Sequence, residues 1–299
     1  MTAVTVIVPV LNGKDTIELC IQSLLQLRPP AGGVELIVVD NGSTDGTIEI
    51  LTRYESRLKV LEQSKPGVSA ARNLGIQHAR ADRVAFIDSD CIAEPDWLRD
   101  IILPLEDLRV GVAGGSILAQ QPCNWIQNFG ERIHDHQRAI EGEDPPYVIG
   151  MNWASRRSVL LEVGLFDERL LRGQDVDLAR RIHAAGYRLI YCPTALVRHR
   201  NRSTISSLFA EGVAHGRAIA LVDRKYRGSS PGCIERTINL TGQIARAVAG
   251  CVHGNARAES VCATVFNAGK LIGMLRWRLA AAFSWQAAVA RTSVSDRER

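Results

Sequence analysis

The first half of the chain alternates short apolar runs with segments whose apolar residues recur every three to four positions. A continuous apolar run predicts a buried strand, and the recurring spacing predicts a helix. The predicted strands of this half are residues 4–8, 34–39, 58–61 and 83–87, and the predicted helices between them are residues 17–27, 47–54 and 67–79. Strands that alternate with helices of crossover length predict a parallel α/β sheet.

The second half is less regular. Its predicted strands are residues 111–118, 148–155, 188–192 and 195–199, and its predicted helices are residues 159–163 and 176–185. Residues 120–146 are polar and irregular, and we expect a flexible crossing or lid there. The fold class is therefore α/β, with a mostly parallel central sheet and flanking helices over residues 1–205. Residues 1–90 form its Rossmann-like half and residues 91–205 its second half.

A helical, basic region follows, residues 206–299. Its predicted helices are residues 208–226, 234–252 and 258–290, and residues 292–299 are expected to fray. From residue 215 to residue 299 the chain has 13 Lys+Arg and 5 Asp+Glu, whereas the rest has 23 and 27. The formal net charge of +4 therefore combines a region of +8 with a body of −4. This asymmetry favours attraction to an anionic surface, or charge balance within the fold.

The tail also carries two tryptophans on one predicted helical face. Trp277 and Trp285 lie two turns apart, and Arg276 and Arg278 flank them. Such a face either packs on the rest of the protein, which is the commoner case, or lies in a membrane interface. The sequence leaves both interpretations open.

Composition indicates an ordinary globular protein, 46% hydrophobic and 23% charged over 299 residues. The seven cysteines include no CxxC pair, which favours reduced core cysteines in a cytosolic protein. The first three residues run into a strand without the basic start of a signal peptide, and no segment has about 18 uncharged apolar residues. We expect a cytoplasmic protein, with the basic tail contacting the inner face of the membrane.

Three strand ends of the first half carry polar residues: Pro9–Asn12, Asp40 and Asp88–Asp90. Ligands of open α/β sheets bind beyond the carboxyl ends of the strands. Mg²⁺ is held by one or two carboxylates plus substrate phosphates. Asp40 can accept a hydrogen bond from a base, and Arg72 offers a planar donor fork. Together these residues predict a nucleotide and metal site, although each has a simpler interpretation as a turn or a helix cap.

Six stretches in order resemble the family 2 glycosyltransferases, inverting enzymes with the GT-A fold that use nucleoside-diphosphate sugars. The resemblance spans about residues 4–200. The stretches are Val6–Asn12, Val38–Thr47, Gly67–Asn73, Phe86–Asp90, Gly164–Glu168 and Gln174–Arg181.

The resemblance implies a role for each matching residue on the donor side. Pro9, Val10, Asn12 and Asp40 are expected to line the nucleotide pocket, with Arg72 close by. Asp88 and Ser89 are expected to face the ribose and diphosphate, and Asp90 to bind Mn²⁺ or Mg²⁺ directly. His199 matches a histidine that reaches the metal or diphosphate, although Arg198-His199-Arg200 also suits a basic surface strand end.

The resemblance places the acceptor chemistry in the second half, residues 91–205. Asp175 is expected to be the catalytic base, and Asn152 and Trp153 to contact the donor sugar and acceptor. A positioned carboxylate removes the acceptor proton during inversion, and a divalent cation neutralises the leaving diphosphate. The family has Glu where this chain has Gln174, which predicts altered acceptor recognition and a lower pKa for Asp175 than in a Glu-Asp pair.

The predicted partners are a nucleotide-sugar donor, with UDP favoured by family tendency, and a glycan, lipid-linked or small-molecule hydroxyl acceptor. Nucleic acid is not expected. A sugar nucleotidyltransferase is less consistent with the first loop, which lacks a Gly-rich basic segment, and no GxGxxG follows the first strand as a dinucleotide enzyme requires. A non-catalytic nucleotide-sugar or glycan-binding module stays open because of Gln174.

Overall fold

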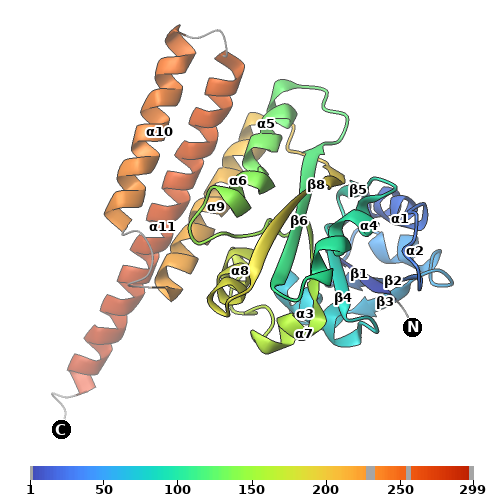
Figure 1. The fold of residues 1–299 in the computed structure, drawn as a ribbon. Coiled ribbons are helices and arrows are strands. Elements are labelled where there is room, and N and C mark those ends of the chain that lie inside the picture. Colours follow the sequence, from blue (N-terminus) through green and yellow to red (C-terminus); the bar gives the residue numbers. More distant parts are fainter. Residues whose placement is uncertain (1–2, 227–232, 254–256, 296–299) are drawn as a thin grey trace. The chain divides into compact units, whose positions relative to one another are not determined.

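The computed structural model describes residues 3–226, 233–253 and 257–295, with side chains described for 3–226, 237–251 and 258–278. Contacts between Cα atoms divide the chain into two compact units. One unit comprises residues 1–123 and 130–201, and the other comprises residues 124–129 and 202–299. We describe each unit by itself (Figure 1).

The first unit is built on one mixed sheet, whose order is β3-β2-β1-β4-β7-β6-β8-β5 among the residues described. The strands are β1 Val4–Val10, β2 Val34–Asp40, β3 Lys59–Glu62, β4 Arg83–Ile87, β5 Cys91–Ala93, β6 Val110–Ala119, β7 Asn152–Arg156 and β8 Arg188–His199. The pairings among β1, β2, β3 and β4 are parallel, and so is the pairing of β6 with β8. Strand β7 pairs antiparallel with both β4 and β6, and β5 pairs antiparallel with β8. The predicted α/β class is confirmed.

Helices cover both faces of this sheet. They are α1 Ile17–Leu25, α2 Thr47–Thr52, α3 Val68–His78, α4 Trp97–Ile102, α6 His136–Glu141, α7 Arg157–Glu162 and α8 Gln174–Ala184, with a 3-10 turn at Leu103–Glu106. Helix α5, Trp125–Ile133, begins in the second unit and ends in the first. Alternate residues of β1 point to opposite faces: Val6 and Val8 pack with α1, and Ile7 packs with α3 and α8. Burial on both faces explains why the central strands are continuously apolar.

The register of the parallel strands brings their carboxyl ends to one edge. Val10 of β1 lies opposite Asp40 of β2, and Ile7 lies opposite Phe86 of β4. The backbone N–H of Asn41 then donates to the Val10 carbonyl at 2.8 Å. The loops that follow β1, β2 and β4 therefore start side by side.

Two sequence predictions about the second half were wrong, and one strand was missed. Residues 120–146 contain helices α5 and α6 instead of an irregular lid. The two predicted closing strands form one strand, β8, whose register against β6 shifts between Gly115 and Ser116. The strand β5 was not predicted because it has only three residues, Cys91–Ala93, too few to show a strand pattern before the turn into α4.

The second unit contains the helices α9 Ile205–Lys225, α10 Cys233–His253 and α11 Arg257–Ser295. Helices α9 and α11 approach closely through glycines: a Cβ on Gly216 would lie 1.9 Å from the Lys270 carbonyl oxygen. The guanidinium of Arg224 in α9 lies 5.6 Å from the ring centroid of Trp277 in α11. Trp277 is thus engaged within this unit, and the side chain of Trp285 lies outside the described residues.

Membrane contact and the boundary at residue 205 stay predictions. Within the part of the chain that the structure describes, no helix combines the length and the apolar character needed to cross a bilayer.

Candidate functional site

Asp40 ends β2 with its carboxylate almost completely buried. One oxygen, Oδ2, accepts from the backbone N–H groups of Gly42 at 2.9 Å and Ser43 at 3.0 Å. The other oxygen, Oδ1, is buried without a hydrogen-bond partner. A buried acceptor without a partner is costly, by about 1–3 kcal/mol. Asp40 therefore presents a desolvated acceptor that suits a ligand N–H.

Asn12 joins the first loop to the second. Its Oδ1 accepts from the Thr44 N–H at 2.9 Å, and its own N–H donates to Ser43 Oγ at 2.8 Å. Its φ is 53°, a left-handed conformation that Asn tolerates better than most residues. Pro9 and Val10 are buried in β1. Asn12 thus holds the loop beside Asp40 in place, and this geometry gives it a structural function.

Arg72 is the charged group at the centre of the site. Its side chain is only 2% exposed, and its Nη2 donates to Asp88 Oδ1 at 2.9 Å and to the Gly150 carbonyl at 2.8 Å. Nε and Nη1 are buried without partners. The guanidinium also lies 5.5 Å from the ring centroid of Phe166. Gly150 must lack a side chain because a Cβ there would lie 2.8 Å from Arg72 Nη2.

Asp175 lies in the first turn of α8, and the same Gly150 peptide holds it. The Gly150 N–H donates to Asp175 Oδ2 at 3.0 Å, and the Val176 N–H donates to Oδ1 at 2.9 Å. Asp88, Arg72, Gly150 and Asp175 therefore form one hydrogen-bonded series. The neighbouring Asp177 is completely buried and pairs with Arg181 at 2.9 Å, one turn further along α8.

The pairing of β5 with β8 brings Asp90 and His199 together. Cys91 lies opposite His199, and Asp90 Oδ2 lies 3.4 Å from His199 Nε2. His199 Nδ1 contacts Asn201 Oδ1 at 2.7 Å. Because that oxygen only accepts, Nδ1 carries the proton and Nε2 faces Asp90. Burial lowers the pKa of His199, but the hydrogen bond and charge of Asp90 outweigh it, so that the pKa is raised.

Asp88 has a raised pKa. Burial is the largest cause; the Arg72 charge opposes it, and the Asp90 charge adds to it. A second cation close to Asp88 and Asp90 would relieve this repulsion. Ser89, between them, is half-buried.

The Asp90–His199 pair offers a carboxylate and an imidazole, two groups that can bind a divalent cation. Among the described residues, no cluster of three or more His, Cys, Asp or Glu side chains forms a complete metal site. A carboxylate, an imidazole oriented through its other nitrogen, and substrate phosphates are a donor set that Mn²⁺ accepts.

The structure contradicts the predicted ligand contacts of Asn152 and Trp153. Asn152 is completely buried: its Oδ1 accepts from Trp97 Nε1 at 2.7 Å, and its Nδ2 donates to the carbonyls of Ser116 and Ala195. Trp153 is also completely buried and stacks on Phe86, with ring centroids 4.3 Å apart. Strand β7 is central in the sheet, so both side chains belong to the core.

Gln174 differs from Asn152, whose polar atoms all have partners, whereas Trp153 also has a buried Nε1 without a partner. Gln174 is 8% exposed, and its Oε1 is buried without a hydrogen-bond partner. The acceptor group that replaces the family's carboxylate is therefore still available to a ligand.

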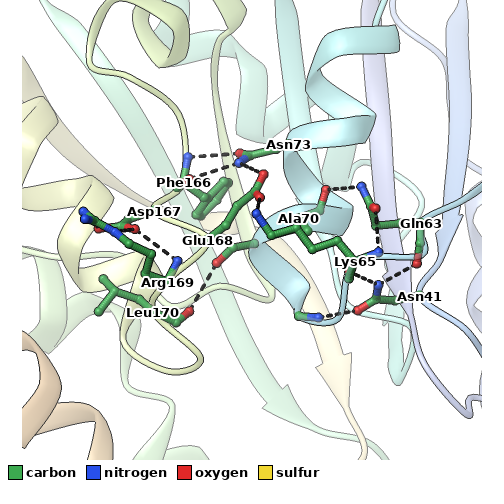
Figure 2. Close-up of polar contacts among 12 residues, drawn as sticks. Asn41, Gln63, Lys65, Ala70, Asn73, Phe166, Asp167, Glu168, Arg169 and Leu170 are labelled. Atoms are coloured by element: carbon green, nitrogen blue, oxygen red, sulfur yellow. Dashed lines mark hydrogen bonds and ion pairs between the residues drawn. The ribbon is translucent and has the colours of Figure 1, made fainter.

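Sequence reasoning missed a network between the loop before α3 and the loop before α8. Figure 2 shows Asn41, Lys65, Asn73 and Glu168 linked through polar contacts. Glu168 lies within a stretch that resembles the family, but its partner Lys65 is 103 positions away. No local spacing could reveal that pairing.

The mixed sheet with helices on both faces is the α/β architecture of the GT-A fold. The family model "Glycosyl transferase family 2" matches residues 5–164, more than half of the chain. The chain therefore belongs to glycosyl transferase family 2.

Curated relatives agree. Glycosyltransferase AglE of Haloferax volcanii is 30% identical over 209 residues, which are 67% of each chain. The pre-mycofactocin glycosyltransferase of Mycobacterium tuberculosis is 30% identical over 236 residues, and this chain spans about half of its length, 47%. An O-antigen chain rhamnosyltransferase, WbaN of Salmonella anatum, is 29% identical over 60% of this chain and 62% of its own.

Solved structures share the fold. A mannosyltransferase from Pyrobaculum calidifontis, solved in complex with GDP-Man and Mn²⁺, has a TM-score of 0.64 at 21% identity, covering 92% of this chain and 86% of its own. S. aureus TarS 1–349, solved with UDP-GlcNAc, has a TM-score of 0.56 at 16% identity, covering 93% and 92%.

Proposed function

We propose that this protein is an inverting, metal-dependent glycosyltransferase that moves a sugar from a nucleoside-diphosphate donor to a hydroxyl acceptor in the synthesis of a glycan, polysaccharide or glycolipid. One observation carries the proposal: buried polar atoms without partners lie on residues of adjoining strand ends and helices. Asp40 Oδ1 supplies an acceptor for a base, and Arg72 Nε and Nη1 supply donors. Family membership makes the ligand a sugar donor.

Asp90 and His199 would hold the cation, with Asp88 beside them. A bound divalent cation supplies charge neutralisation for a departing diphosphate. The Mn²⁺ in the archaeal mannosyltransferase complex supports this assignment. The Asn201 contact keeps the His199 ring in the orientation that turns Nε2 toward Asp90.

Asp175 is the proposed general base. The acceptor hydroxyl gives its proton to the Asp175 carboxylate while its oxygen forms the new bond to the anomeric carbon. The bond from that carbon to the diphosphate breaks, and its electron pair leaves with the diphosphate. The N–H groups of Gly150 and Val176 fix the carboxylate but leave lone pairs on both oxygens. Because the acceptor oxygen attacks the face opposite the departing diphosphate in a single displacement, the anomeric centre is inverted.

A thermal-shift screen of nucleoside diphosphates and their sugars, with and without Mn²⁺, tests the donor assignment. A ligand that binds the folded state raises its melting temperature. We expect at least one nucleotide to give a Mn²⁺-dependent shift in the wild type and a shift without Mn²⁺ dependence in Asp90→Ala and His199→Ala. A Mn²⁺-dependent shift that persists in both variants would remove the metal pair from the proposal.

The anomeric configuration of the product tests the mechanism. With the donor that binds, NMR of the first-formed product should show inversion. Retention would exclude Asp175 as the sole reacting carboxylate.

A further inference from the structure

The segment 164–173 leads from α7 into the turn of α8 that carries Asp175. Its ends are fixed by left-handed backbone conformations, with φ of 87° at Gly164, 60° at Leu165 and 73° at Gly173. Between these points the segment has no helix or strand of its own. Its position therefore depends on side-chain contacts with neighbouring elements.

Asn73 of α3 makes the inner contact. Its Oδ1 accepts from the Phe166 N–H at 3.0 Å, and its Nδ2 donates to the Phe166 carbonyl at 3.0 Å and to Glu168 Oε1 at 2.9 Å. Figure 2 shows these bonds joining the helix to the segment. The Phe166 ring, in turn, lies under the Arg72 guanidinium. The first part of the segment is thus fixed on the helix that presents Arg72.

Glu168 makes the outer contact, an ion pair with Lys65. Lys65 lies in the loop before α3, which Asn41 organises: Asn41 Nδ2 donates to the Lys65 carbonyl at 2.7 Å, and the Gly67 N–H donates to Asn41 Oδ1 at 2.7 Å. Asn41 directly follows Asp40. A continuous series of contacts therefore runs from the base-pocket aspartate to the segment that ends at Asp175.

This ion pair adds little to global stability. The Lys65 and Glu168 side chains are 61% and 29% exposed, and ion pairs exposed to water contribute little to folding stability. The Lys65 and Asn73 hydrogen bonds lower the pKa of Glu168, so the carboxylate is charged at neutral pH. The ion pair joins two loops of one site and adds little to the stability of the core. Its main effect is therefore on the relative placement of those loops.

We propose that Glu168 is a positioning residue. Its ion pair with Lys65 connects the segment that leads to Asp175 with the loop beside Asp40. A donor bound at that loop therefore also fixes the position of the general base. The inference rests on the proposed function, because it assumes that Asp175 is the base. It adds that base placement depends on a contact outside the reacting groups.

Steady-state kinetics of the full chain test this. Glu168→Gln keeps an oxygen for Asn73 but removes the charge facing Lys65, and Lys65→Met removes the cation while retaining the alkyl chain. We expect each variant to lower kcat about tenfold, with the nucleotide Kd within about twofold of wild type and a Tm within about 2 °C. Because the two changes remove one interaction, the double variant should be no slower than either single variant.

Two further variants act as controls. Arg169 pairs with Asp167 inside the same segment and does not reach α3, so Arg169→Gln should keep wild-type kcat. Lys65→Arg retains the cation and should recover most of the activity. Losses that add in the double variant, or an equal loss in Arg169→Gln, would overturn the proposal.

Hydrogen exchange separates failure of this inference from failure of the proposed function. Amides of residues 166–174 should exchange about fivefold faster in Glu168→Gln than in wild type or Arg169→Gln, whether or not a transfer reaction is found. Bound nucleotide with Mn²⁺ should slow this exchange in wild type and not in Glu168→Gln. Identical exchange in the two proteins would refute the positioning contact even if sugar transfer is confirmed.

Discussion

Two sets of buried polar side chains lie in the same unit and differ in how completely they are hydrogen bonded. In the interior set, Asn152 and His136, the side-chain nitrogen and oxygen atoms all have partners. In the site set, Asp40, Arg72 and Gln174, at least one buried atom of each residue has none. Both sets are desolvated, so burial alone does not separate structural from functional polar groups.

The difference teaches which groups the fold leaves for a ligand. A buried polar group with its partners stabilises or specifies the core, whereas one without partners costs free energy that the fold must offset. The core residue Trp153, whose Nε1 is also buried without a partner, shows that a missing hydrogen bond alone does not mark a ligand contact. We propose that a ligand restores the missing hydrogen bonds of the site set. This predicts that substitutions in the interior set reduce stability and that substitutions at the site reduce binding or turnover.

The largest effect is expected for Asp175→Asn. The substitution retains the size of the side chain but cannot take the acceptor proton. Transfer should fall about 10²–10⁴-fold, as for loss of a general base, while the nucleotide Kd stays within about twofold. Rapid-quench turnover and calorimetric titration measure the two quantities. A fully active variant would show that another group is the base and that Asp175 has a structural function.

Asn152→Ala should give the next largest effect, on stability. The change strips partners from Trp97 Nε1 and from two carbonyls, and leaving buried groups unsatisfied costs about 1–3 kcal/mol each. We expect the free energy of unfolding in urea to fall by about 3 kcal/mol. The folded variant should bind nucleotide as wild type does. Weakened binding at unchanged stability would restore Asn152 to the ligand contacts that the sequence predicted.

His136, the other residue of the interior set, should contribute to the free energy of unfolding in a pH-dependent way. Burial lowers its pKa to about 3, although the Gly115 carbonyl opposes this. The unfolded chain, with a pKa of about 6.5, takes up a proton first as the pH falls. The stability contributed by neutral His136 is therefore complete above about pH 6.5 and is lost progressively toward pH 3, by about 2 kcal/mol between pH 7 and pH 5.

The measurement is the free energy of unfolding at pH 7 and pH 5. His136→Gln can still donate to Gly115 and accept from Ile149, so it should remove that part of the pH dependence. The exposed His78→Gln is the control and should retain it. Equal pH dependence in the two variants would show that His136 does not cause the loss.

The smallest effect is expected for Asp40→Asn, on binding. The amide places an N–H₂ donor where the structure has only acceptor oxygens, so either the loop or the ligand loses a hydrogen bond. We expect the nucleotide Kd to rise about tenfold, equivalent to about 1.4 kcal/mol, with the free energy of unfolding within about 1 kcal/mol. The control is Asp82→Asn. The Asp82 carboxylate accepts hydrogen bonds from Ser158 near the opposite ends of the strands, so this change should leave the Kd unchanged.

Local patterns predicted most of the first half because parallel strands buried on both faces are continuously apolar. The strand ends then identified Asp40, Asp88 and Asp90 from order alone. The pattern could not show that the Asn152 side-chain oxygen accepts a hydrogen bond from Trp97, since that contact spans 55 positions. The helical face of Trp125, Ile126 and Phe129 was present in the sequence, but the polar residues around it favoured a loop.

Strand β5 sets the order in which the site can be assembled during synthesis. Asp90 and His199 meet only when Cys91–Ala93 pairs with the end of β8, more than one hundred residues further along the chain. A nascent chain still held on the ribosome at α7 already contains strands β2 and β4, which place Asp40 and Asp88 at the sheet edge, and helix α3, which carries Arg72. It lacks the imidazole. The proposed Asp90–His199 cation site is consequently completed last, when most of the first unit has been synthesised.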